Sequence, residues 1–163
     1  MIRLPRFWRR HFLTVELIFA LSLATVFAFW YTYMGGAAAT NTVLQGNRAT
    51  FYGTTASILG SLLGFVITAT SIVLGFSTSD RISVVRESAE YLKLWKIFSS
   101  TIRALAFATI ISLACLLFDR DSSSSQWLVV FLIYAVLLAL LRIGRTIWAL
   151  EQIIFLVTRP SPK

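Results

Sequence analysis

Four apolar stretches dominate the sequence and restrict the folds that are open to it. A helix needs roughly 20 apolar residues to cross about 30 Å of hydrocarbon, and each stretch approaches that length. Because 57% of the 163 residues are hydrophobic and only 13% are charged, the stretches exceed what the core of a soluble domain requires. We therefore predict an all-α, polytopic membrane protein that forms a single transmembrane domain, with spans at about 13–34, 52–76, 99–118 and 126–147.

The first stretch has two features of a cleaved signal peptide, namely arginines before it and small residues after it. The apolar region of a signal peptide, however, has only about 7–15 residues, and the run from Phe12 to Met34 is longer than that. We expect this segment to be retained as the first of the four spans.

Lys and Arg residues gather before the first span, between the second and third spans, and after the fourth. The two other connections contain one basic residue each, Arg48 and Arg120. The positive-inside rule then places both termini in the cytoplasm, and we expect the inner membrane of a prokaryotic cell as the location. Because this distribution already explains the net charge of +8, we expect the basic face to bind anionic lipid headgroups and no nucleic acid.

The connection between the second and third spans, residues 80–98, has charged side chains on one helical arc and apolar side chains on the other. This pattern predicts an amphipathic cytoplasmic elbow helix that lies at the membrane interface or extends the adjacent spans into the cytoplasm. A second interpretation makes the elbow a gate lever or a collar for an anionic small-molecule ligand. The candidate contacts for such an anion, or for lipid headgroups, are Arg81, Arg86, Lys93 and Lys96.

Side chains that carry catalysis or bind metals are scarce. The chain has one His and one Cys, His11 and Cys115, so one copy contains neither a His-based acid–base pair nor a His/Cys metal cluster. The glycines of the sequence GSLLGF lack the Lys-Ser/Thr ending of a phosphate loop and lie inside a span. We therefore expect a protein that is not an enzyme, with no catalytic residue, no metal and no cofactor.

Ionisable residues at or within membrane spans are functional candidates by default, and five lie within a few turns of the inner boundary: Glu16, Arg103, Arg142, Arg145 and Glu151. We expect an intramembrane ion pair in which Glu16 contacts Arg103 or Arg142 and locks neighbouring helices. The small multidrug-resistance exporters carry an essential carboxylate deep in their first span, and Glu16 is too shallow for that role. A small transporter that couples uptake to protons through Glu16 remains an alternative.

Small and hydroxyl-bearing residues recur in the second span at separations of 3 or 4 residues, which places them on one face of a helix. Their small size permits close helix packing, and their hydroxyls offer hydrogen bonds to ions or water without a fixed charge. Gly60 and Gly64 add a GxxxG pair for helix packing at the edge of this face. We call the face the small-residue stripe; its predicted pore-lining members are Ser57, Ser61, Gly64, Thr68, Ser71, Gly75 and Thr78.

Together these features predict a parallel homo-oligomeric ion channel or pore, a tetramer or a pentamer, with the second span nearest the axis. The charge asymmetry favours parallel copies over the antiparallel pairs of the small fluoride channels. In layout alone the chain looks like the small membrane effectors of bacterial antiviral systems, and that resemblance implies opening after a cytoplasmic signal. A non-conducting sensor, assembly factor or accessory subunit that packs on another protein through the same stripe is the main alternative.

Residues 35–51 connect the first two spans and contain the sequence GGAAATNT. We expect a flexible cap here. A helix extension and an outer vestibule with Arg48 at its mouth are the alternatives.

Overall fold

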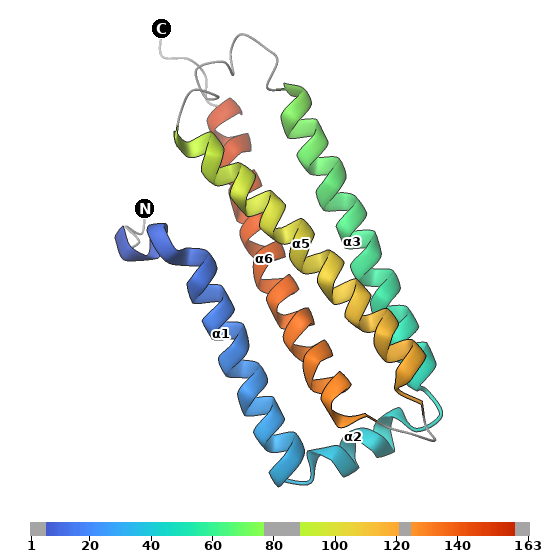
Figure 1. Ribbon diagram of the computed structural model, residues 1–163. Helices are drawn as coiled ribbons and strands as arrows, with labels where there is room; N and C mark the ends of the chain where they lie inside the picture. The colour runs from blue at the N-terminus through green and yellow to red at the C-terminus, as the bar shows by residue number, and fades with distance from the viewer. Residues whose placement is uncertain (1–5, 77–88, 121–124, 159–163) are drawn as a thin grey trace, which may run out of the picture.

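The computed structural model describes residues 6–76, 89–120 and 125–158 (Figure 1). This part of the chain is all-helical, as the sequence predicts, and four of its helices are long and apolar enough to span a membrane. A shorter helix connects the first two of these. In chain order the helices are α1 (Arg6–Tyr33), α2 (Gly36–Leu44), α3 (Arg48–Phe76), α5 (Ala89–Phe118) and α6 (Gln126–Thr158).

The apolar segments of the four long helices overlap the four predicted spans and extend beyond several of their ends. These segments are Phe12–Tyr33, Arg48–Ile72, Leu94–Phe118 and Trp127–Glu151. The extensions include charged residues at the helix ends, where long side chains can reach toward polar headgroups while their stems stay in apolar surroundings. The helix lengths and composition therefore identify a multi-pass membrane protein.

The four long helices form an open row rather than a closed bundle (Figure 1). α3 packs on α5, α5 packs on α6, and α6 packs on α1, so that α1 and α3 are at the two edges. The short helix α2 crosses one end of the row and leads from α1 to α3. The opposite end carries the beginnings of α1 and α5 and the ends of α3 and α6.

The main core lies where α5 packs between α3 and α6. Alanines at these contacts let the helix backbones approach closely, as is common between membrane helices. A smaller cluster attaches α1 to the row, because the fully buried Ala20 packs with Ala104 of α5 and Leu138 of α6. The buried side chains of the main core are Leu59, Val66, Phe98, Leu105, Ala108, Ala135 and Ala139.

Large apolar side chains also cover the outside of the row. Phe65, Val26 and Ile110 are among many that are more than half exposed on the long helices. An isolated soluble protein would not expose so much contiguous apolar surface, whereas lipid tails solvate it readily. The surface therefore fits a chain surrounded by lipid or by further helices.

Two glycines define the connection from α1 to α3. Gly35, with φ of 76°, precedes α2, and Gly46, with φ of 74°, follows it, so both occupy the left-handed region that a glycine adopts without strain. Gly36 lies against the Trp30 ring, where a Cβ atom would come within 2.6 Å of a ring carbon. Residues 35–51 therefore fold into α2 and the first turn of α3, and the flexible cap expected from the sequence is wrong.

The predicted elbow, residues 80–98, is described only in part. Residues 89–98 form the first turns of α5 and continue without a break into its apolar segment. The remaining residues of the predicted elbow, 80–88, lie outside the described residues.

Candidate functional site

The small-residue stripe lies on the face of α3 that is turned away from α5. At about 3.6 residues per turn, the stripe is opposite Leu59 and Val66, which are buried in the core with side chains of α5. Gly75 lies in the last turn of α3, and Thr78 lies outside the described residues. The stripe residues whose surroundings are described are all exposed: Ser57, Ser61, Gly64, Thr68 and Ser71.

The glycines of this face have open space beside them. A Cβ atom built at Gly60 or Gly64 would meet no atom within 4 Å outside its own helix backbone and chain neighbours. Glycines that exist to let two helices touch leave no room for a Cβ, as Gly36 illustrates against Trp30. Among the described residues, the GxxxG pair therefore does not serve helix packing within one copy of the chain.

Two stripe hydroxyls donate to carbonyls of their own helix. The Thr68 hydroxyl donates to the Gly64 carbonyl at 3.0 Å, and the Ser71 hydroxyl donates to the Ile67 carbonyl at 3.0 Å. Because each hydroxyl oxygen has two lone pairs and its only hydrogen is used internally, the oxygen remains an acceptor on the exposed face. This face therefore presents oxygen acceptors and bare backbone among apolar neighbours.

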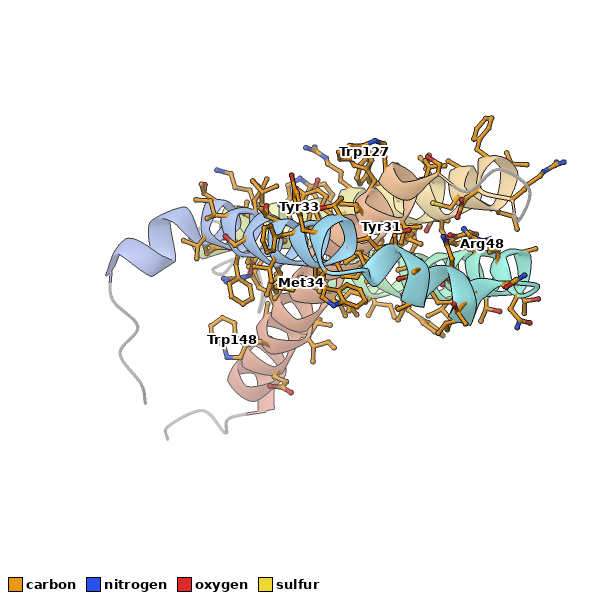
Figure 2. All side chains as sticks on the ribbon, turned by 90° about the horizontal axis from the view of Figure 1, so that it is seen from below. Tyr31, Tyr33, Met34, Arg48, Trp127 and Trp148 are labelled. Atoms are coloured by element: carbon orange, nitrogen blue, oxygen red, sulfur yellow. The ribbon has the colours of Figure 1, made fainter. Side chains whose placement is uncertain are left out.

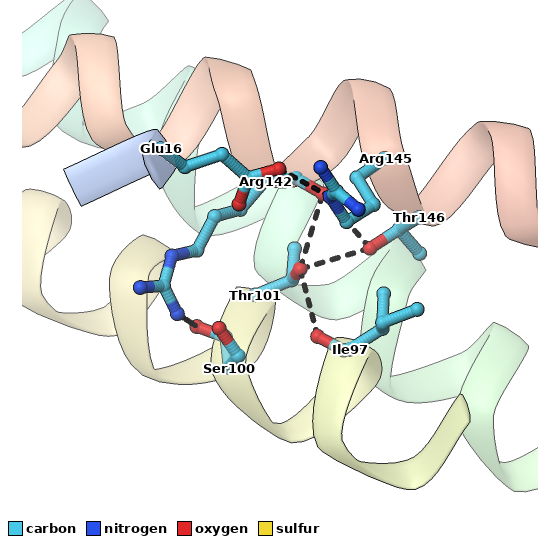
Figure 3. A network of polar contacts seen from close by, with 7 residues as sticks. All are labelled: Glu16, Ile97, Ser100, Thr101, Arg142, Arg145 and Thr146. Carbon is cyan, nitrogen blue, oxygen red and sulfur yellow. Dashed lines mark hydrogen bonds and ion pairs between the residues drawn. The ribbon is translucent and has the colours of Figure 1, made fainter. Parts of the chain in front are cut away.

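A polar network joins α1, α5 and α6 near the end of the row opposite α2 (Figure 3). Arg145 Nε donates to a carboxylate oxygen of Glu16, which is only 8% exposed, and the Arg145 guanidinium carbon lies 4.2 Å from the centroid of the Phe12 ring. Arg142 donates to the Ser100 carbonyl at 3.3 Å. The network therefore ties α1 to α6 by an ion pair and a cation–π contact, and α6 to α5 by a hydrogen bond.

Two threonines continue this network between α5 and α6. The Thr101 and Thr146 hydroxyl oxygens are 2.8 Å apart, and both hydroxyls also lie within hydrogen-bond distance of the Arg142 carbonyl. Both threonines are almost fully buried. Interhelical hydroxyl contacts of this kind stabilise helix pairs in lipid by about 1 kcal/mol.

The ion pair differs from the sequence-based expectation. Glu16 contacts Arg145, whereas the prediction paired it with Arg103 or Arg142; Arg103 is exposed on α5. Arg142 belongs to the same network but contacts Ser100. The sequence places Arg145 at the same depth, but the prediction does not choose it as a partner; it lies three residues after Arg142 on the same side of α6, so the helical period gives it an equal claim.

A second buried cluster lies at the α2 end of the row. Arg48 and Tyr52, both from the start of α3, donate to the same carboxylate oxygen of Asp119, which follows α5. The other carboxylate oxygen accepts a hydrogen bond from the backbone N–H of Ser125 at 2.7 Å, and Arg48 also donates to the Asn41 side chain at 2.5 Å. The cluster therefore connects α2, α3, α5 and the segment that leads into α6.

The side chains of this cluster are almost completely buried. Arg48 is 5% exposed and Asp119 is 2% exposed, and in the end-on view of Figure 2 Arg48 lies between the ribbons while Trp127 lies at the outer edge. Arg48 therefore does not lie at an open mouth, as one alternative for residues 35–51 had it. Asp119 is a site residue that no sequence motif indicates, although Arg48 and Asp119 lie at the same predicted end of the spans.

Two of the four basic residues proposed as anion or lipid contacts lie in the described part of the chain, both on α5. Lys96 is exposed on α5, and Lys93 lies in the first turns of the same helix. Arg81 and Arg86 lie outside the described residues. Of the four, Lys93 and Lys96 lie three residues apart on α5.

Within residues 6–76, 89–120 and 125–158, no three His, Cys, Asp or Glu side chains are grouped so that they could hold a metal ion. Comparison of the chain with protein-family models, with curated proteins and with solved structures gives no match.

Proposed function

We propose that the chain is the subunit of a parallel homo-oligomeric ion channel, in which copies of α3 surround a common axis and the small-residue stripe lines the path. One observation carries the proposal. The long Gly-, Ser- and Thr-rich face that the sequence singles out is exposed on an edge helix, and its Gly60 and Gly64 have room that no neighbour in the described part of the chain uses. An edge position lets α3 approach other copies without rearranging the row.

The chemistry of the face supports a path for ions or water. Hydroxyl oxygens that accept hydrogen bonds, such as those of Thr68 and Ser71, can replace part of the hydration shell of a cation and introduce no fixed charge. Lipid tails contain no hydrogen-bond donor, so they cannot form hydrogen bonds with these oxygens. In a closed ring, the stripe of each copy would face the stripes of the other copies, and lipid would be excluded from it.

The proposed orientation has both termini in the cytoplasm of a prokaryotic cell, with the basic residues facing anionic headgroups of the inner leaflet. All copies then insert in the same direction, as a parallel ring requires. The predicted elbow would lie at the cytoplasmic mouth, where Lys96 and its basic neighbours in sequence are available to an anionic ligand or to lipid.

Ion flux through liposomes that contain the purified chain tests the proposal. Thr68→Phe fills the stripe and is expected to abolish flux while the oligomer stays intact. Thr25→Phe is the matched control, because Thr25 is also exposed and its hydroxyl also donates to a carbonyl four residues earlier, but Thr25 lies on α1. Flux that is lost equally in both variants, or unchanged in Thr68→Phe, contradicts a path along α3.

A non-conducting subunit that packs on another protein is the second candidate, since the same open glycines fit a foreign helix. The liposome measurement separates the two functions. Absence of flux for the wild-type chain at either polarity, in membranes with and without anionic lipid, favours the non-conducting subunit and contradicts the channel.

A further inference from the structure

The polar network between α1 and α6 contains one carboxylate and two guanidinium groups. Glu16 forms its ion pair with Arg145, and Arg142 belongs to the same polar network (Figure 3). Arg142 and Arg145 are three residues apart on α6, so they face the same side of the helix and are separated by about 4.5 Å along its axis. One acid therefore has two basic partners available on neighbouring turns.

Both groups that would form the second pair have an unsatisfied atom. Among the residues that the structure describes, Glu16 Oε2 has no donor and Arg142 Nε has no acceptor, and both atoms are inaccessible to solvent. A buried acceptor and a buried donor without partners destabilise the arrangement that contains them. The two atoms have complementary charge and belong to facing helices, so they would satisfy each other if they met.

The contact between α1 and α6 permits movement along the helix axis. α1 is an edge helix whose main contacts are with α6 and the adjoining α2. Its buried positions next to Glu16 on this side are the small residues Ala20 and Ala24, which present little relief to a sliding neighbour, and the larger buried Tyr31 lies two turns further on, at the α2 end. A shift of one helical turn between packed helices is a known form of conformational switching.

Arg145 would keep a partner after such a shift. Its guanidinium already lies over the ring of Phe12, which is one turn before Glu16 on α1. If α1 moves toward the α2 end by the axial spacing of the two arginines, Glu16 reaches Arg142. Phe12 then moves close to the height along α6 that Glu16 occupied before. The cation–π contact then replaces the ion pair at Arg145.

We propose that Glu16 exchanges between Arg145 and Arg142, and that α1 thereby has two stable positions along α6, about 4.5 Å apart. The structure shows the position in which Glu16 contacts Arg145. This switch stands independently of ion conduction, because it concerns α1 and α6, whereas the proposed path follows α3.

Distances between pairs of spin labels in lipid nanodiscs test the proposal, with both pairs made in a Cys115→Ala background. The pairs are Thr14 with Leu140 and Thr25 with Ile147, and all four positions are exposed. If α1 moves toward the α2 end, the first distance shortens, because Thr14 lies farther from that end than Leu140 does. The second distance lengthens, because Thr25 already lies closer to that end than Ile147 does. A general loosening of α1 would not produce opposite changes.

Arg145→Gln removes the partner that Glu16 has in the structure, and we expect the two distances to change in these opposite directions by up to about 4.5 Å. Arg142→Gln is the matched control. It is expected to leave both distances at the values found when Glu16 contacts Arg145. Unchanged distances in Arg145→Gln overturn the proposal, and so does a broad distribution without a displaced maximum, which indicates that α1 has detached.

Arg145→Lys provides a second variant if the Gln variant does not fold. Lysine keeps the charge but loses the planar donor pair, so the exchange is expected to produce a minor, displaced distance population in both label pairs. A single population at the wild-type distances in this variant overturns the proposal as well.

Discussion

Arg48 and Asp119 form an ion pair across 71 residues of sequence, with side-chain exposures of 5% and 0%. The pair joins the start of α3 to the residue that follows α5, at the end of the row that carries α2. Tyr52 and the backbone of Ser125 complete the hydrogen bonds of the carboxylate. A buried carboxylate with this many donors is stable only while each charge has its partner.

Asp119→Asn is expected to lower the free energy of unfolding by about 3–5 kcal/mol, because the buried Arg48 charge loses its compensation. Thermal unfolding in detergent measures the change. The double variant Arg48→Met with Asp119→Leu is expected to recover most of this loss, since it removes both charges. A single variant as stable as the wild-type chain would show that the pair contributes nothing to stability.

Tyr52→Phe removes one donor to the same carboxylate and leaves the ring in place. We expect a loss of about 1.5–3 kcal/mol, the range for a hydrogen bond to a charged group. Tyr33→Phe is the matched control, because Tyr33 is 78% exposed, and a change within about 0.5 kcal/mol is expected there. Equal changes for the two variants would contradict a specific role of the Tyr52 hydroxyl.

Gly36→Ala is expected to destabilise the α1–α2 corner by about 1–3 kcal/mol, since the added Cβ would lie 2.6 Å from a carbon of the Trp30 ring. Gly53→Ala serves as the control. A Cβ at Gly53 meets no atom within 4 Å, so alanine within α3 is expected to stabilise the chain by about 0.5–1 kcal/mol. Both changes are read from the unfolding temperature. A stabilising Gly36→Ala would contradict the packing of this corner.

The proposed orientation predicts the accessibility of single cysteines in a Cys115→Ala background. Gln45→Cys, at the end of α2, is expected to react with an impermeant thiol reagent added outside intact cells. Ser161→Cys is expected to react only after the cells are opened. The reverse pattern would place both termini outside and would invert every statement about cytoplasmic contacts.

The sequence predicts the four long helices because apolar length is a local property that lipid imposes directly. It also predicts the small-residue stripe on one face of α3, since helical period determines the face. It does not predict which face α3 turns to α5. That choice depends on Leu59 and Val66 meeting α5 and α6 side chains, which are distant in sequence.

Pairing of charges is harder to predict for the same reason. Several cations lie near the depth of Glu16, and the relative rotation and height of α1 and α6 decide that it meets Arg145. The burial of Arg48 similarly requires α2 to fold back over the end of the row, and the composition of residues 35–51 contains little sign of this beyond its glycines. Tertiary packing therefore determines the polar contacts, although local pattern determines the helices that carry them.

A density map of the purified particle in lipid nanodiscs tests the central claim most directly. The account predicts a ring of parallel copies in which Ser61, Gly64 and Thr68 of each α3 face the shared axis. A map in which these residues face lipid, or in which another helix of the chain surrounds the axis, would contradict it.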